Sequence, residues 1–315
     1  MELDKVLEFD QDNLTITVEA TITNRELNKV LAPASLIFPT LNSNLDMTIG
    51  EQLANNYSLV RSSRFGEWTD NILGLEFRTN KGHLIKTGGK TFKNVSGYDV
   101  VPLVIGTKNT IGEITKVVLK LSPTPEAACI ISCKLVSIEQ GAAIKTAIKA
   151  TDIEPTALTM VAENNAMTLQ IELMGDEVTV AAQKEKAIKA LTNYQIADTQ
   201  DIYFASLGVN LPKTGLLIST AADQCVPILQ ELLTRLTDMG IAYKVTGDLY
   251  NHRIILDFAN ELESGSLEPI YSYLKDVDIY VDAINLQLPF QNTLWYDSSQ
   301  LAIIDKLKNM LGETI

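Results

Sequence analysis

Apolar and polar residues alternate in short runs through the first third of the chain, a pattern that is typical of strands with one buried face. Residues 14–20 (LTITVEA) show this alternation clearly. Thr23, with Glu26 three positions later, forms a capping-box pattern that predicts a short helix over 24–31. The other elements expected here are a hairpin of strands 73–78 and 83–86 around Asn80-Lys81-Gly82, and a strand over 114–121.

Two prolines in Ser122-Pro123-Thr124-Pro125 end the last of these strands, because proline gives no N–H to a sheet and restricts the residue before it. Beyond this segment the order strand, helix, hairpin, helix occurs twice, over 128–194 and over 215–275. That order predicts two α+β units that share one antiparallel sheet with helices on one face. The strands are expected at 128–136, 156–162, 167–173, 215–219, 241–246 and 253–258, and the helices at 137–150, 176–194, 220–239 and 261–275.

The expected fold class is therefore α+β, with the chain divided into residues 1–124, 125–280 and 281–315. The last of these regions is a tail. Its amphipathic pattern predicts a helix over 299–311 that packs back on the first domain.

Charge and composition exclude several classes of protein. The 315 residues include 26 Lys and Arg against 39 Asp and Glu, which gives a net charge of −13. Such a surface repels phosphate backbones and anionic membranes, and this argues against nucleic-acid binding. The chain has no apolar run of about 18 residues that would predict a transmembrane helix. Met1 is followed by acidic residues rather than by a secretory signal, so we expect a cytoplasmic protein.

Few residues are suited to catalysis or to holding a metal. Cys129 and Cys133 lie four positions apart with no further ligand nearby, and Cys225 stands alone, so buried thiols are expected and no metal site. His83 and His252 fall beside turns in different domains, and exposed turn positions are the simpler interpretation. No nucleophile elbow, P-loop or dinucleotide fingerprint follows a predicted strand.

Glycines are concentrated between Gly88 and Gly112. Glycine lets a backbone approach a ligand closely, and its amides can hold an anion. The run Lys93-Asn94-Val95-Ser96-Gly97-Tyr98-Asp99 adds side-chain donors and a ring that could stack on a planar group. The residues alone leave two interpretations open, a ligand-binding loop or a pair of tight turns between strands, and they favour the turns.

The same segment carries a resemblance to a known family. The sequence GGKTFKNVSGYDVVPLVIGTKNTIGEITKVVLKLSP, residues 88–123, resembles the flavin-domain motif of vanillyl-alcohol-oxidase type FAD-linked oxidases. It looks closest to the FAD-binding small subunits of bacterial glycolate oxidases. Upstream, 48–50 is similar to the family's TIGG turn and 65–74 to its GSVRDFVLG segment. The resemblance covers residues 1–125 and extends to the second domain only through element order.

This resemblance implies a fold and a set of contacts. Residues 1–124 would be the second half of a FAD-binding (PCMH-type) domain, and 125–280 a cap domain that covers the isoalloxazine and shapes the substrate pocket. The flavin would perform the redox chemistry, and the protein would position it. The residues implied to approach or line the flavin are Thr48, Ile49, Gly50, Lys93, Asn94, Gly97, Tyr98, Asp99, Gly112 and Ile114. The resemblance assigns no catalytic residue and no metal ligand.

The chain also departs from the family pattern. Relative to the family it is expected to be truncated before Met1, without the strand–helix–strand unit whose glycine-rich loop holds the FAD pyrophosphate, which would leave that site incomplete. Glu51 replaces the second glycine of the TIGG turn and would place a carboxylate against the flavin. Asn109 replaces a glycine of the family's GSxGxLG pattern.

Two functional hypotheses follow. In the first, the protein is a subunit of a FAD-linked 2-hydroxyacid oxidoreductase complex of the glycolate or lactate type. It would not be catalytic alone, and its partners would be a catalytic flavin subunit and an iron–sulfur subunit. In the second, it is a flavin-free scaffold or assembly subunit that retains the fold. Both hypotheses predict a hetero-oligomer, and neither identifies the substrate.

Overall fold

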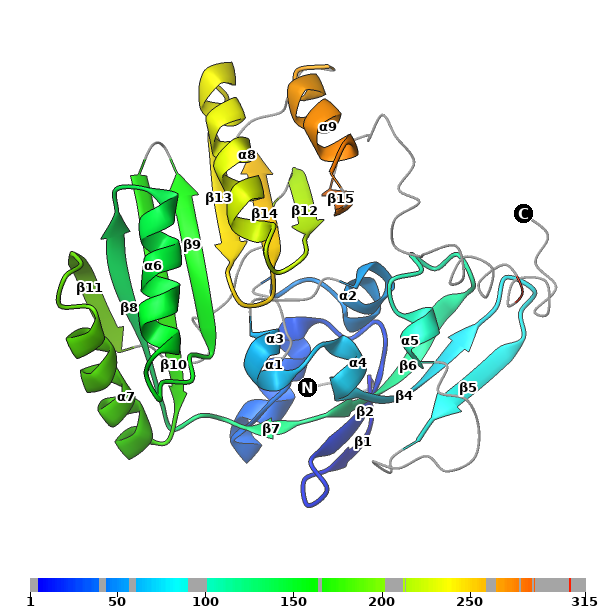
Figure 1. Cartoon of the computed structure of the whole chain (residues 1–315). Helices are drawn as coiled ribbons and strands as arrows, with labels where there is room; N and C mark the ends of the chain where they lie inside the picture. Colours follow the sequence, from blue (N-terminus) through cyan, green and yellow to red (C-terminus); the bar gives the residue numbers. More distant parts are fainter. Residues whose placement is uncertain are drawn as a thin grey trace. The chain divides into compact units, whose positions relative to one another are not determined.

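The computed structural model describes residues 5–39, 44–56, 61–89, 101–163, 166–201, 212, 214–258, 265–277, 279–284, 286 and 306. The chain forms two compact units, and the first gives way to the second between Thr124 and Pro125 (Figure 1). Each unit has its own sheet and its own hydrophobic core. The tail helix expected over 299–311 lies outside the described residues, apart from Lys306.

The first unit is built on a five-stranded antiparallel sheet in the order β1-β2-β6-β4-β5. Its strands are β1 (Val6–Asp10), β2 (Thr15–Glu19), β4 (Ile72–Arg78), β5 (Leu84–Gly88) and β6 (Glu113–Lys120). Its helices are α1 (Asn24–Leu31), a 3-10 turn (Ala32–Ala34), α2 (Ile49–Asn55), α3 (Ser62–Phe65), α4 (Trp68–Asn71) and α5 (Val101–Val104). A short pair, β3 (Leu36–Ile37) and β7 (Ser122–Pro123), lies beside them. The predicted strands, hairpin and capped helix of this region are confirmed.

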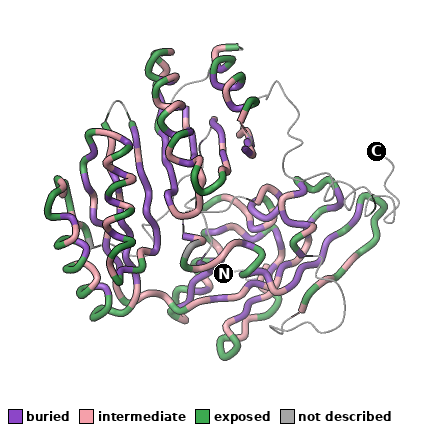
Figure 2. Tube along the Cα trace, in the orientation of Figure 1, coloured by how far each residue is buried: buried purple, intermediate pink, exposed green. Residues whose placement is uncertain are grey.

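The core of the first unit lies on one face of this sheet. Alternate residues of β2, Ile16 and Val18, are buried, as the period-two pattern predicted. Leu27, on the buried face of α1, is fully buried in the same core. The largest buried side chain is Trp68, whose ring centroid lies 5.4 Å from that of Phe38. Figure 2 shows the buried positions following the strands of both sheets.

The second unit is built on one eight-stranded antiparallel sheet in the order β11-β8-β10-β9-β13-β14-β12-β15, with helices on one face (Figure 1). Its strands are β8 (Ala127–Leu135), β9 (Ala157–Glu163), β10 (Ala166–Gly175), β11 (Ile196–Asp201), β12 (Gly215–Ser219), β13 (Tyr243–Asp248), β14 (Arg253–Phe258) and β15 (Tyr280–Ile284). Its helices are α6 (Ile138–Lys149), α7 (Glu177–Ala190), α8 (Cys225–Met239) and α9 (Glu268–Lys275).

This sheet contains the same motif twice. The series β8-α6-β9-β10-α7-β11 and β12-α8-β13-β14-α9-β15 have the same element order, and each half arranges its four strands as 4-1-3-2. The halves join edge to edge through β9 and β13, where Met160 lies opposite Gly247. The predicted repeat is confirmed, and each copy gains a fourth strand, β11 or β15, that the sequence pattern did not predict.

Several predicted element ends were wrong. α8 begins at Cys225 and not at Thr220, because the Thr220 N–H and hydroxyl both donate to the carbonyl of His252 and hold this residue beside the β13–β14 turn. α7 ends at Ala190, four residues before Tyr194. β13 starts at Tyr243 instead of Ile241. Within the described residues α9 starts at Glu268, and residues 261–264 of the predicted helix lie outside them.

At the centre of the second unit a glycine faces a large side chain in each half. In one half the glycine is on the strand, and in the other half it is on the helix. On one side a Cβ atom at Gly247 of β13 would lie 2.6 Å from Cδ1 of Leu229 in α8. On the other side the order is reversed, since Gly141 of α6 lies over Met160 of β9, with a built Cβ 3.1 Å from Sδ. Each helix therefore approaches the sheet closely because one partner of each pair is glycine.

Gly247→Ala is expected to lower the free energy of unfolding by about 1–2 kcal/mol, because the added methyl group displaces Leu229. In a Leu229→Ala background the same substitution should cost close to nothing. Urea denaturation followed by circular dichroism measures the four proteins of this cycle. An equal cost of Gly247→Ala in both backgrounds would contradict the contact.

Candidate functional site

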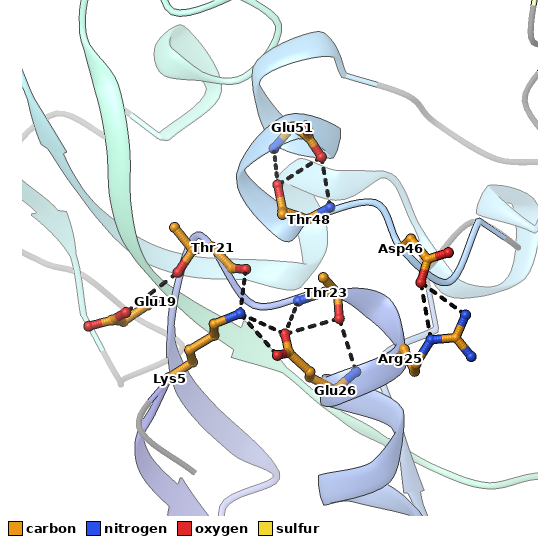
Figure 3. A network of polar contacts seen from close by, with 9 residues as sticks. All are labelled: Lys5, Glu19, Thr21, Thr23, Arg25, Glu26, Asp46, Thr48 and Glu51. Carbon is orange, nitrogen blue, oxygen red and sulfur yellow. Dashed lines mark hydrogen bonds and ion pairs between the residues drawn. The ribbon is translucent and has the colours of Figure 1, made fainter. Parts of the chain in front are cut away.

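The start of α2 coincides with the predicted TIG segment. Thr48 caps the helix, and its Oγ1 accepts a hydrogen bond from the N–H of Glu51 at 3.1 Å. In return the Glu51 carboxylate accepts from the N–H and hydroxyl of Thr48, at 2.9 and 3.0 Å (Figure 3). The carboxylate that replaces the family glycine is therefore held by the cap of its own helix.

The first amides of α2 are already bonded within the unit. The N–H of Ile49 donates to the carbonyl of Ile22 at 3.0 Å, and that of Gly50 to the carbonyl of Ala20 at 2.8 Å. A Cβ atom at Gly50 would lie 3.0 Å from Cβ of Ala20, so glycine here allows α2 to approach the end of β2. These amides hold the helix in place and are not free to bind a phosphate.

A second group of predicted residues lies at the start of β6. Gly112 has φ +151°, and a Cβ atom there would lie 2.5 Å from the carbonyl oxygen of Arg78. Ile114 is buried in the core and pairs with Phe77 of β4. Both residues therefore have packing roles of their own.

The structure brings these two groups together. The N–H of Ala20, beside Gly50, donates to the carbonyl of Thr115, the neighbour of Ile114, at 2.9 Å. The other predicted residues, Lys93, Asn94, Gly97, Tyr98 and Asp99, lie outside the described residues. Sequence reasoning missed Ala20, whose position between the two groups depends on contacts far apart in the chain and leaves no local signal.

A network of polar contacts fixes the entrance to α2 (Figure 3). A second capping box joins Thr23 and Glu26 at α1, and the Lys5 ammonium lies 2.9 Å from the Glu26 carboxylate. The N–H of Thr23 and the Lys5 ammonium together lower the pKa of Glu26. Thr23 and Thr48 form a β-bridge, so the two caps lie side by side.

Glu76 is a buried carboxylate on β4. Its oxygens lie 3.0 Å from Nζ of Lys86 and 3.4 Å from Nζ of Lys116, and one accepts from the hydroxyl of Thr115 at 3.2 Å. Burial raises the pKa of Glu76, but the two lysines outweigh burial and the net pKa is lowered. This cluster ties β4 to both neighbouring strands, β5 and β6.

Because the folded pKa of Glu76 lies below its unfolded value, its contribution to stability is present above the unfolded pKa and is lost as pH falls through the folded pKa. Glu76→Gln is therefore expected to cost about 1–2 kcal/mol at neutral pH and little in acid, since the lysines stay partly hydrated. Urea unfolding at both pH values measures the difference, with Glu113→Gln, an exposed neighbour on β6, as control. A cost that is the same at both pH values would contradict this role.

Metal and thiol chemistry find no support among the described residues. No three or more His, Cys, Asp or Glu side chains there are grouped to hold a metal. Cys129, Cys133 and Cys225 are buried free thiols, as expected, and burial raises the pKa of Cys225 to about 11. His83 is exposed as predicted, whereas His252 is half-buried, so the exposed position expected for it was wrong. No helix within the described ranges has the length and apolar character to span a membrane.

Residues 1–88 match the FAD binding domain family. The resemblance to FAD-linked oxidases is confirmed. The match includes α1 and α2 with their capping boxes. It ends at Gly88, shortly before the segment that holds Lys93 to Asp99.

Curated relatives extend the match beyond this domain. The glycolate oxidase subunit GlcD of Bacillus subtilis (strain 168) is 31% identical over 157 residues, which cover 50% of this chain and 33% of that protein. The mitochondrial D-lactate dehydrogenase [cytochrome] of Arabidopsis thaliana is 26% identical over 188 residues, covering 55% of this chain and 33% of that protein. The D-lactate dehydrogenase of Archaeoglobus fulgidus is 34% identical over 117 residues, 37% of this chain and 26% of that protein. The matched segments thus span a third or less of these relatives' own lengths.

Solved structures of alkyldihydroxyacetonephosphate synthase share the fold. One aligns with a TM-score of 0.66 and 14% identity, over 98% of this chain and 65% of that chain. A second crystal form gives the same TM-score over 64% of its chain. At this identity the likeness establishes the fold across nearly the whole chain and says nothing about the substrate.

Proposed function

We propose that this chain is the FAD-binding component of a FAD-linked oxidoreductase that acts on 2-hydroxy acids of the glycolate or D-lactate type. The observation that carries the proposal is the match of residues 1–88 to the FAD binding domain family, with relatives named as a glycolate oxidase subunit and as D-lactate dehydrogenases. A bound flavin would accept the two electrons released when a 2-hydroxy acid becomes a 2-oxo acid.

In this proposal the two described groups of site residues form the structural support of the cofactor site. The segments 48–50 and 112–114 are joined through Ala20 and are fixed by their own hydrogen bonds and packing. Lys93, Asn94, Gly97, Tyr98 and Asp99 supply the direct contacts. Contacts to the pyrophosphate come from groups other than the first amides of α2, because those amides already bond to Ala20, Ile22 and Thr48.

We further propose that the chain works in a cytoplasmic complex with a catalytic flavin subunit and an iron–sulfur subunit, and is not catalytic alone. The printed name of the Bacillus relative, a subunit of glycolate oxidase, supports an assembly of this kind. The assignment of a FAD domain over 1–124 and a cap domain from 125 belongs to the same proposal. The sheet of the second unit extends past the expected boundary at 280, because β15 runs to Ile284.

A flavin-free scaffold is the second candidate. It is favoured by one observation, that Thr48, Ile49, Gly50, Gly112 and Ile114 all have internal roles that need no ligand. In this case the fold would persist without the cofactor, and the partner subunits would carry the redox chemistry.

The visible absorbance of the purified protein distinguishes the two candidates. The spectrum is recorded before FAD is added, and again after FAD is added and the excess removed by gel filtration. Retention of close to one flavin per chain supports the first proposal, and assays with glycolate and D-lactate on the assembled complex then test the substrate. A colourless protein whose melting temperature does not rise with FAD would sink it, since any ligand of the native state stabilises that state.

A further inference from the structure

Two lysines of the second unit occupy an unusual position on α6. Lys145 and Lys149 lie one helical turn apart, each directly after a fully buried core residue, Ile144 or Ile148. They therefore stand at the border of the core on the side of α6 that approaches the β13–β14 turn. The Lys145 ammonium donates a hydrogen bond to the carbonyl of Leu249 in that turn.

The second copy of the motif shows what the equivalent positions hold elsewhere. In α8 the residues that follow the core positions Leu232 and Leu236 are Leu233 and Thr237. They help to line an open hollow of about 390 Å³ beside α8. The fold thus accepts neutral side chains at these positions and does not require lysine.

Both ammonium groups converge on one aromatic ring. Nζ of Lys145 lies 5.9 Å and Nζ of Lys149 5.6 Å from the ring centroid of Tyr250. Neither lysine forms an ion pair within the described part of the chain. A cation–π contact offsets only part of the cost of holding two like charges together.

Burial and the charge of Lys149 lower the pKa of Lys145 by more than the charge of Asp248 raises it. Asp248 is 1% exposed, and its carboxylate accepts from the N–H groups of Tyr250 and Asn251 and from the Asn251 side chain. The cluster is thus a local positive site on a chain whose net charge is −13.

His252 adds a third nitrogen. It ends the same turn with φ +56°, and its Nδ1 is buried with no hydrogen-bond partner among the described residues. It follows Tyr250, the ring under both ammonium groups, by two residues. Burial, followed by the charges of Lys145 and Lys149, lowers the pKa of His252. The hydroxyl of Thr220 and the thiol of Cys225 lie on the α8 side of the same turn.

We propose that Lys145, Lys149 and His252 form a binding site for a phosphate group. A phosphate dianion would neutralise both ammonium groups and place negative charge beside the turn that carries His252, whereas a single carboxylate would balance only one charge. The site lies wholly within the second unit and does not depend on the proposed flavin function.

Nuclear magnetic resonance of the histidine rings tests the site in the full chain. The protein has two histidines, so His83 in the first unit is an internal control. Inorganic phosphate is expected to raise the pKa of His252 by about one unit relative to chloride at the same ionic strength, and to leave His83 unchanged. Equal shifts of both histidines, or an equal effect of acetate, would overturn the proposal.

Two lysine variants complete the test. Lys149 is exposed, so Lys149→Gln should fold normally and weaken phosphate binding about tenfold. Lys189→Gln, in the last turn of α7, is the matched control and should bind as the wild type does. Phosphate affinity that is unchanged by Lys149→Gln would overturn the proposal. Tighter binding of glycerol phosphate than of inorganic phosphate would identify a phosphorylated small molecule as the ligand, and the reverse would identify free phosphate.

Discussion

Gly88→Ala is expected to destabilise the first unit by about 3 kcal/mol or more, whereas Gly89→Ala should leave its stability unchanged. Gly88 ends β5 with φ +73°, and a Cβ atom there would overlap the carbonyl oxygen of Leu73 and lie 2.6 Å from Cα of Gly74. A Cβ atom at Gly89 would meet nothing within 4 Å. Thermal unfolding of the two variants, followed by circular dichroism, measures the difference.

A third glycine separates the clash from the backbone strain. Gly82, in the β4–β5 turn, has φ +83°, close to that of Gly88, but open space around its Cβ position. Gly82→Ala should therefore cost only about 1–2 kcal/mol, the strain of a left-handed alanine. If Gly88→Ala costs no more than Gly82→Ala, the close approach of β4 and β5 is not what requires glycine.

The same variants bear on the proposed flavin site, because Gly88 and Gly89 lead directly into the segment that holds Lys93 to Asp99. Gly88→Ala should lose FAD together with the fold. Gly89→Ala keeps the fold, so a loss of FAD in that variant alone would report a direct approach of the backbone to the cofactor.

Local rules predicted much of the fold because they depend on residues close in sequence. Thr23 and Glu26 were recognised as a capping box, and the structure confirms it. Thr48-Ile49-Gly50-Glu51 follows the same rule, but its resemblance to a glycine turn directed attention to the missing glycine. The pattern itself held the signal that Glu51 faces its own helix.

Elements whose position depends on distant partners were not predicted. β11 has the sequence IADTQD, with little apolar alternation, and it forms because β8 offers it an edge. β15 likewise pairs with β12, which lies more than sixty residues earlier in the chain. The repeat was visible in element order. The sequence did not show that Gly141 faces Met160 in one copy while Leu229 faces Gly247 in the other, because equivalent positions hold different residues.

The position of Gly50 shows the same limit at the candidate site. The resemblance assigned this glycine to a flavin contact, and in the structure it lets α2 approach Ala20. One glycine can both contact a flavin and let α2 approach Ala20. The approach to Ala20 depends on the pairing of β2 with β6, which brings together residues far apart in the sequence. Residue type therefore predicts where the site lies but not the structural role of each residue in it.

Asp248→Ala is expected to destabilise the second unit by about 3 kcal/mol, and Asp248→Asn by about 1 kcal/mol or less. The carboxylate accepts hydrogen bonds from the N–H groups of Tyr250 and Asn251 at 2.9 and 3.0 Å, and alanine removes the acceptor of both part-buried donors. Asparagine keeps an oxygen in place for them. Urea unfolding at neutral pH measures both variants.

The difference in stability between wild type and Asp248→Asn should depend on pH. Burial raises the pKa of Asp248, and its hydrogen bonds and Arg253 lower it by less. Because the folded pKa of Asp248 is raised, its contribution to the free energy of unfolding is present below the unfolded pKa. That contribution is lost as pH rises through the folded pKa. Wild type should therefore gain stability relative to Asp248→Asn as the pH is lowered. A gap that stays constant with pH would show that the buried carboxylate carries no ionisation cost, and that the turn presenting Tyr250 and His252 is held by geometry alone.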